Sequence, residues 1–141
     1  MVMNTKIYKQ VHSLAKDLLK ASQGKNQQEF DKSYAQLLKI CEEHEDSPKD
    51  HPVQWETLAD FTEDLEQAIA LYEKALLKAE AIESKDFCAS IGYSLATMKI
   101  ELGDTKAAIA NLEKAKVNCA NTDDKLLKAE VHDLLFKLKK N

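Results

Sequence analysis

Cysteine and histidine side chains that lie close together in the sequence are the first candidates for chemistry, because both bind zinc. Cys41 and His44 form a Cys-x-x-His pair, and the carboxylates of Glu45 and Asp46 separate them from His51. A zinc site of this kind needs a second ligand pair at a comparable spacing, and none follows in the chain. We therefore interpret Cys41 as a packing residue at the end of a helix, and we predict no metal and no cofactor.

Cys88 is the candidate for nucleophilic catalysis. It lies near the start of a predicted helix, where the positive helix end lowers the pKa of a thiol. No pattern in the sequence places a histidine or other general base where it could activate Cys88. The chain also lacks Gly-x-Ser-x-Gly, P-loop and His-Glu-x-x-His motifs. We expect Cys88 to be half-buried in a contact between helices, and we expect the protein not to be an enzyme.

The charged residues and cysteines limit the classes of partner. All 20 basic residues are lysines, and 24 acidic residues give a net charge of −4. Nucleic-acid binders carry a basic surface and use arginine to contact phosphate and guanine, so we expect no nucleic acid partner. No apolar stretch approaches the roughly 18 residues that identify a membrane span, so we expect no membrane partner. Three widely spaced cysteines indicate reduced thiols and predict a cytoplasmic protein.

The composition favours helices throughout. Leu, Ala, Lys and Glu supply 68 of the 141 residues, whereas Gly and Pro supply only 3 and 2. This balance is typical of long helices and lacks the turn residues of a β-sandwich or barrel. Apolar residues recur at steps of three and four, which predicts one all-α domain over residues 1–141. Its seven predicted helices cover residues 4–22, 27–44, 52–61, 64–83, 85–102, 105–119 and 124–140.

An internal repeat of 40 residues is the strongest pattern in the chain. Residues 68–75 align with residues 108–115, and six of these eight positions are identical. A weaker shift of 38 residues relates residues 30–41 to residues 68–79. Periods of this length are typical of stacked helix pairs, each of which cannot bury its apolar face alone. The 40-residue shift also pairs Ala79 with Cys119, Ala89 with Ala129, Ile91 with Val131, Leu95 with Leu135 and Met98 with Leu138.

These residues resemble the tetratricopeptide repeat (TPR). In that family the second helix of a unit carries a small residue, a large residue four positions on, and an alanine three further. Ala68, Tyr72 and Ala75 fit this pattern, as do the three positions 40 residues later. The spacing is longer than the usual length of about 34 residues, and is similar to the lengthened repeats of the family. The resemblance implies a right-handed superhelical stack of three TPR-like helix pairs, with approximate repeats 4–44, 50–83 and 85–119, plus a C-terminal capping helix over 124–140.

The resemblance also implies a binding site. In TPR proteins the first helices of the units line a concave face, which holds a peptide or helix of a partner protein. A groove with Phe61, Tyr93 and Ile100 favours a partly apolar segment anchored by aromatic residues. The positions expected to face the groove are Asp60, Phe61, Ser90, Tyr93, Thr97, Ile100, Glu130, Asp133 and Lys137.

The expected function is therefore a non-catalytic protein–protein interaction module. A second hypothesis is a small TPR-type export or secretion chaperone that holds a client protein, because the size and the three-repeat layout resemble that class too. A third hypothesis is a self-assembling structural module that forms a homo-oligomer through its C-terminal helix. Leu126 and Phe136 lie off the main apolar stripe of that helix and would supply the contact.

Overall fold

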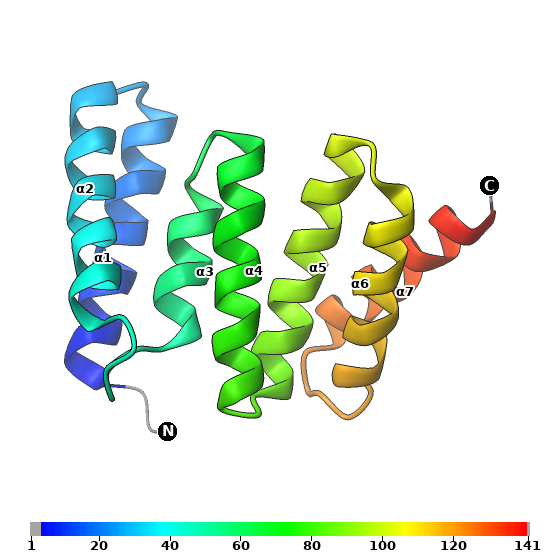
Figure 1. Cartoon of the computed structure of the whole chain (residues 1–141). Helices are drawn as coiled ribbons and strands as arrows, with labels where there is room; N and C mark the ends of the chain where they lie inside the picture. Colours follow the sequence, from blue (N-terminus) through cyan, green and yellow to red (C-terminus); the bar gives the residue numbers. More distant parts are fainter. Residues whose placement is uncertain (1–3, 141) are drawn as a thin grey trace.

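The computed structural model describes residues 4–140, and all regular structure in that range is helical (Figure 1). The prediction of an all-α chain is confirmed, and every helix lies within two residues of its predicted bounds. The seven helices of the described residues are α1 (Thr5–Gln23), α2 (Gln27–His44), α3 (Pro52–Asp60), α4 (Leu65–Ala81), α5 (Lys85–Leu102), α6 (Thr105–Asn118) and α7 (Lys125–Lys140). No helix among these residues is both long and apolar enough to cross a membrane.

Polar side chains fix the start of each helix. In five helices the side chain just before the first turn accepts a hydrogen bond from a backbone N–H of that turn. These residues are Asn4, Asn26, Asp64, Ser84 and Asp104. His51 caps α3 in a reciprocal arrangement with Gln54, and Asp124 accepts from the N–H of Leu127 in α7. Gly103 ends α5 in the left-handed conformation, at a φ of 91°, as the sequence predicts.

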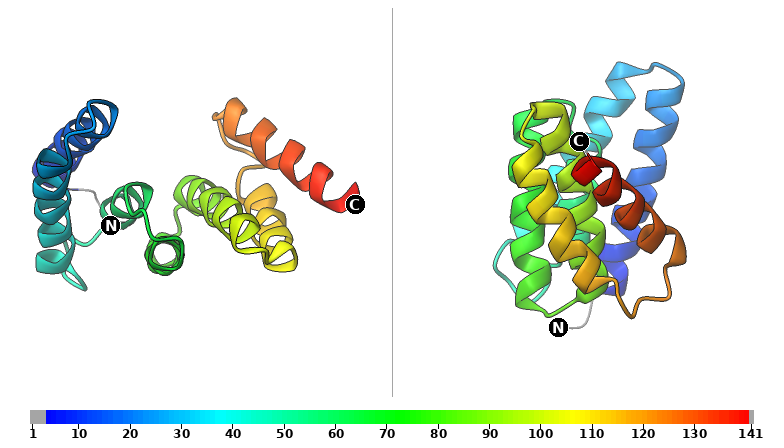
Figure 2. Two further views of the ribbon diagram at one scale, coloured as in Figure 1. Left: turned by 90° about the horizontal axis from the view of Figure 1, so that it is seen from above. Right: turned by 90° about the vertical axis from the view of Figure 1, so that its right-hand side faces the viewer.

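The helices form two layers along a curved stack. The odd-numbered helices lie on one side and the even-numbered helices on the other, and each helix packs against its neighbours in sequence. Seen from above (Figure 2, left), α1 and α7 extend to the same side at the two ends of the stack. As a result, α3 and α5 lie on the inner side of the curve.

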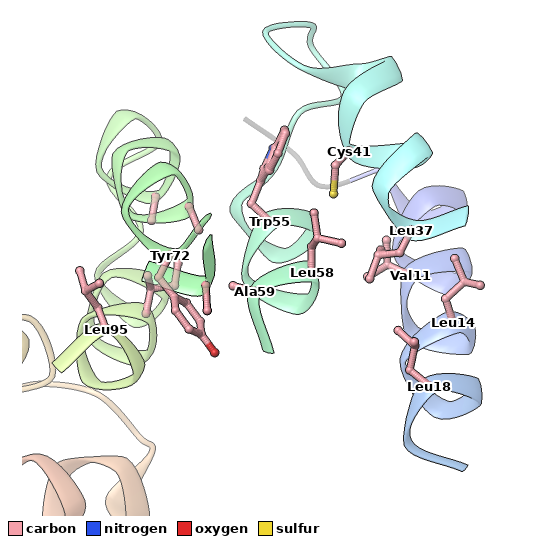
Figure 3. Close-up of a cluster of buried hydrophobic side chains, with 14 of the residues drawn as sticks. Val11, Leu14, Leu18, Leu37, Cys41, Trp55, Leu58, Ala59, Tyr72 and Leu95 are labelled. Atoms are coloured by element: carbon pink, nitrogen blue, oxygen red, sulfur yellow. The ribbon is translucent and has the colours of Figure 1, made fainter. Parts of the chain in front are cut away.

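The apolar core is divided into two clusters that share α5. The first cluster runs from α1 to α5 (Figure 3), and the second joins α5 to α6 and α7. Cys88, Ile91 and Leu95 of α5 belong to the first cluster, whereas Ala89 and Ala96 belong to the second. One helix therefore connects the two halves of the core through opposite faces.

The repeated small residues are packing positions. Cys41, Ala79 and Cys119 occupy corresponding places, and each is at most 1% exposed. This confirms the interpretation of Cys41 as a packing residue. Gly92 faces Ala115 of α6, and a Cβ atom added there would lie 3.5 Å from the Ala115 Cβ, which is an ordinary contact distance.

A buried carboxylate fastens the loop over residues 45–51 to the stack. Asp50 accepts hydrogen bonds from the Trp55 indole at 2.8 Å, from the Lys78 ammonium at 2.6 Å and from the Asp46 N–H at 2.8 Å. Burial alone would raise the pKa of Asp50, but these hydrogen bonds, that of Lys78 foremost, outweigh it and lower the pKa. The Lys74 ammonium lies 4.2 Å from the centre of the Trp55 ring and stacks over it.

Candidate binding surface

The inner side of the curve brings together predicted site residues from α5 and α7. The Ser90 hydroxyl donates a hydrogen bond of 2.8 Å to the Glu56 carboxylate, which links α5 to α3. Glu130 of α7 lies beside the Tyr93 hydroxyl. Burial raises the pKa of Tyr93, and the Glu130 carboxylate adds to the increase. A row of polar side chains therefore extends from α5 to α7 on the inner side, and it consists of Ser90, Tyr93 and Glu130.

Glu56 is the main residue of this surface that sequence reasoning missed. Burial raises the pKa of Glu56 from its usual 4.5 to about 7. The hydrogen bond from Ser90 opposes this rise, and the nearby Asp60 carboxylate adds to it. Asp60, a predicted site residue, accepts a hydrogen bond of 2.5 Å from Tyr72, and burial raises its pKa too. Glu56 lies four residues before Asp60, so helical spacing alone would have placed both carboxylates on one face.

A pocket of about 510 Å³ lies where the start of α5 meets the start of α7. Phe87 and Leu127 supply apolar walls. Among residues 4–140 the Asp123 carboxylate has no hydrogen-bonding or ionic partner. The complete lining is Asp86, Phe87 and Ser90 from α5, Thr122, Asp123 and Asp124 from the preceding loop of α7, and Leu127 from α7. The pocket is thus apolar inside and acidic at its rim.

Two of the pocket carboxylates, those of Asp86 and Asp124, also accept hydrogen bonds that fix the α6–α7 loop and the start of α7. The Thr122 hydroxyl donates a hydrogen bond of 3.0 Å to Asp86, which ties the α6–α7 loop to α5. Asp124 accepts a hydrogen bond of 3.0 Å from the N–H of Leu127. These contacts give the rim of the pocket a defined shape.

Comparison with family models, with curated proteins and with solved structures finds no match.

The remaining predicted residues of α5 and α7 have structural contacts or face solvent. The Thr97 hydroxyl donates to the Ser94 carbonyl within α5 at 2.7 Å, and Ile100 packs against the second core cluster. Asp133 and Lys137 are exposed on α7. All four lie on helices that border the inner side, but none lines the pocket.

Phe61 lies apart from this surface. It packs edge-on against Phe30 of α2, with ring centroids 6.5 Å apart and an angle of 64° between the planes. It lines a separate shallow pocket between the starts of α2 and α4. The short α3 ends at Asp60, so the chain turns toward α4 at Phe61. The aromatic residue that lines the pocket between α5 and α7 is Phe87 instead.

The thiol candidates for chemistry are buried. Burial raises the pKa of the Cys41 thiol to about 12, and the Sγ donates to the Gln54 carbonyl at 3.3 Å. Burial also raises the pKa of Cys88, the reverse of the lowering that an activated nucleophile needs. Among residues 4–140, no three His, Cys, Asp or Glu side chains are grouped to hold a metal ion.

Proposed function

We propose that the chain is a non-catalytic protein-interaction module of the TPR type, which binds a segment of a partner protein on its inner side. The architecture we propose is a right-handed superhelical stack of three TPR-like helix pairs plus the capping helix α7. The pocket between α5 and α7 is the observation that carries the functional proposal, because it combines apolar walls with polar groups of defined position.

The burial of the repeated positions supports the TPR architecture. Ala68, Ala75 and their counterparts Ala108 and Ala115 are at most 1% exposed. Small residues at these places allow close approach of paired helices, which is their role in the family pattern. The alternation of odd-numbered and even-numbered helices across two layers is consistent with the same architecture.

The charge of the inner side indicates the chemistry of the bound segment. Three carboxylates surround the pocket, those of Asp86, Asp123 and Asp124. A lysine or arginine side chain would lay its aliphatic stem against Phe87 and Leu127 and bring its charge to the rim. The favoured ligand is therefore a segment that has a basic residue next to apolar ones.

A peptide selection tests this proposal. Random peptides displayed on phage are selected against the protein, and the strongest binder is synthesised and titrated into ¹⁵N-labelled protein. We expect basic and apolar peptides, with chemical-shift changes centred on Ser90, Asp123 and Leu127. Reversing the rim charge in Asp123→Lys should weaken binding by about tenfold, since this carboxylate meets the ligand's charge.

Glu42→Lys is the matched control, because Glu42 is an exposed carboxylate on α2 in the other layer. It should leave the affinity unchanged. Equal binding by both variants, or shift changes confined to the even-numbered helices, would contradict the proposed site.

A further inference from the structure

The sequence of the last helix, α7, aligns with that of α5, and the corresponding face of each helix is buried in the core. A shift of 40 residues pairs Ile91 with Val131 and Leu95 with Leu135. All four side chains are buried, with exposed fractions between 0% and 5%. Like Ile91 and Leu95 of α5, Val131 and Leu135 of α7 therefore pack back onto the preceding part of the stack.

The opposite face of α5 is covered by the helix that follows it. Ala89 and Ala96 are 0% exposed, and Gly92 between them approaches Ala115 of α6. Among all helix pairs in the described residues, α5 and α6 share the most extensive contact. This face is thus the place where the second helix of a unit packs onto the first.

In α7 the corresponding face has no such helix over it. The same shift pairs Ala89, Gly92 and Ala96 with Ala129, His132 and Phe136, which we call the outer face of α7. All three are exposed, and Phe136 is 64% exposed although its counterpart Ala96 is fully buried. In Figure 1, α7 ends the stack, and no helix of the described residues lies beyond it.

The charge of α7 indicates what would cover this face. Residues 125–140 hold five lysines against Glu130 and Asp133, whereas the whole chain is acidic. A second copy of the chain docked end to end is a poor match. Docking α7 on another α7 brings like charges together, and the helix at the other end, α1, holds four lysines against Asp17.

We propose that the outer face of α7 binds an acidic amphipathic helix of a partner protein, packed on α7 as α6 is packed on α5. His132 and Phe136 are larger than the Gly92 and Ala96 they replace, so the bound helix needs small residues opposite them. Phe136 would be the main anchor, because a large apolar side chain loses the most exposed surface on docking. This second surface is independent of the pocket between α5 and α7.

A peptide based on the sequence of α6 serves as the probe. It copies residues 104–119, carries the changes K106E, K114E, K116E and C119S, and keeps the small residues Ala108 and Ala115. Titrated into ¹⁵N-labelled protein up to about 1 mM, the weak end of specific binding, it should shift the amides of Ala129, His132 and Phe136. Phe136→Glu should weaken binding by about tenfold or more, with an unchanged melting temperature because Phe136 is exposed.

Val117→Glu is the matched control, since Val117 is an apolar side chain of α6 that is 74% exposed. It should bind the probe as the unaltered protein does. A probe that fails to shift the outer face at this concentration would overturn the proposal. Sedimentation provides the second measurement: a dimer that Phe136→Glu converts to monomer would make a second copy the occupant, and would equally overturn it.

Discussion

Replacing Glu56 with glutamine should stabilise the protein in neutral and mildly alkaline solution but not in acid. The amide has nearly the shape of the carboxyl group and can still accept the hydrogen bond from Ser90. It cannot ionise, so it removes the cost of holding a charge at this half-buried place. The effect of the change is therefore confined to the pH range in which Glu56 loses its proton.

The size of the effect follows from the two pKa values. The pKa of Glu56 rises from 4.5 in the unfolded chain to about 7 in the folded protein, so the folded state holds the proton more tightly. The resulting stability is fully present below 4.5 and is lost as the pH rises through about 7. The difference corresponds to about 3 kcal/mol, or roughly 10 °C in Tm for a chain of this length.

Thermal unfolding followed by circular dichroism at several pH values measures this difference directly. At about pH 4, below both pKa values, Glu56→Gln and the unaltered protein should melt together, and by about pH 8 the variant should melt higher. Glu101→Gln, which alters an exposed carboxylate of α5, is the control and should follow the unaltered protein throughout. A Glu56→Gln curve that stays parallel to the unaltered one from acid to alkali would refute the reasoning.

Three further changes test the packing. Asp50→Asn should lower the free energy of unfolding, measured in urea, by about 2–4 kcal/mol, because it leaves the Lys78 ammonium without its buried counter-charge. A loss below about 1 kcal/mol would mean that the pair contributes little. Gly92→Ala should be neutral or stabilising by up to about 1 kcal/mol, since the added methyl meets Ala115 at an ordinary contact distance, and a large loss would contradict that spacing. Gly103→Ala should destabilise the protein by about 1 kcal/mol, because alanine is strained at the positive φ of this position. An unchanged urea midpoint would show that the turn relaxes.

The helices were predictable because their signals are local. Side chains such as Ser84 bond to the next turn of backbone, and Gly103 ends a helix through its own φ angle. The internal repeat extended this local information to packing, since a position that is small in successive units is one that neighbouring helices bury. Cys41 and its counterparts could be assigned to the core in this way.

The candidate site was only partly predictable, because its shape depends on where α3 ends and how the α6–α7 loop folds. Ser90, Tyr93 and Glu130 were expected on one surface from the resemblance to the TPR family, and Tyr93 does lie beside Glu130. Phe61 was expected on the same surface, but the nine-residue α3 ends before it and the ring packs on Phe30. Phe87 was not found, because no pattern in the sequence indicates that the α6–α7 loop folds beside the start of α5.

The division of the core into two clusters joined by α5 makes the stability of this protein local. Each part of the stack contacts only its neighbours, so opening α6 and α7 exposes the second cluster and leaves the first closed. Amide hydrogens in these last two helices can then exchange with solvent through a partial opening, while those of α1 to α4 exchange only when the larger cluster comes apart. The C-terminal end can therefore loosen or tighten without transmitting that change to the N-terminal helices.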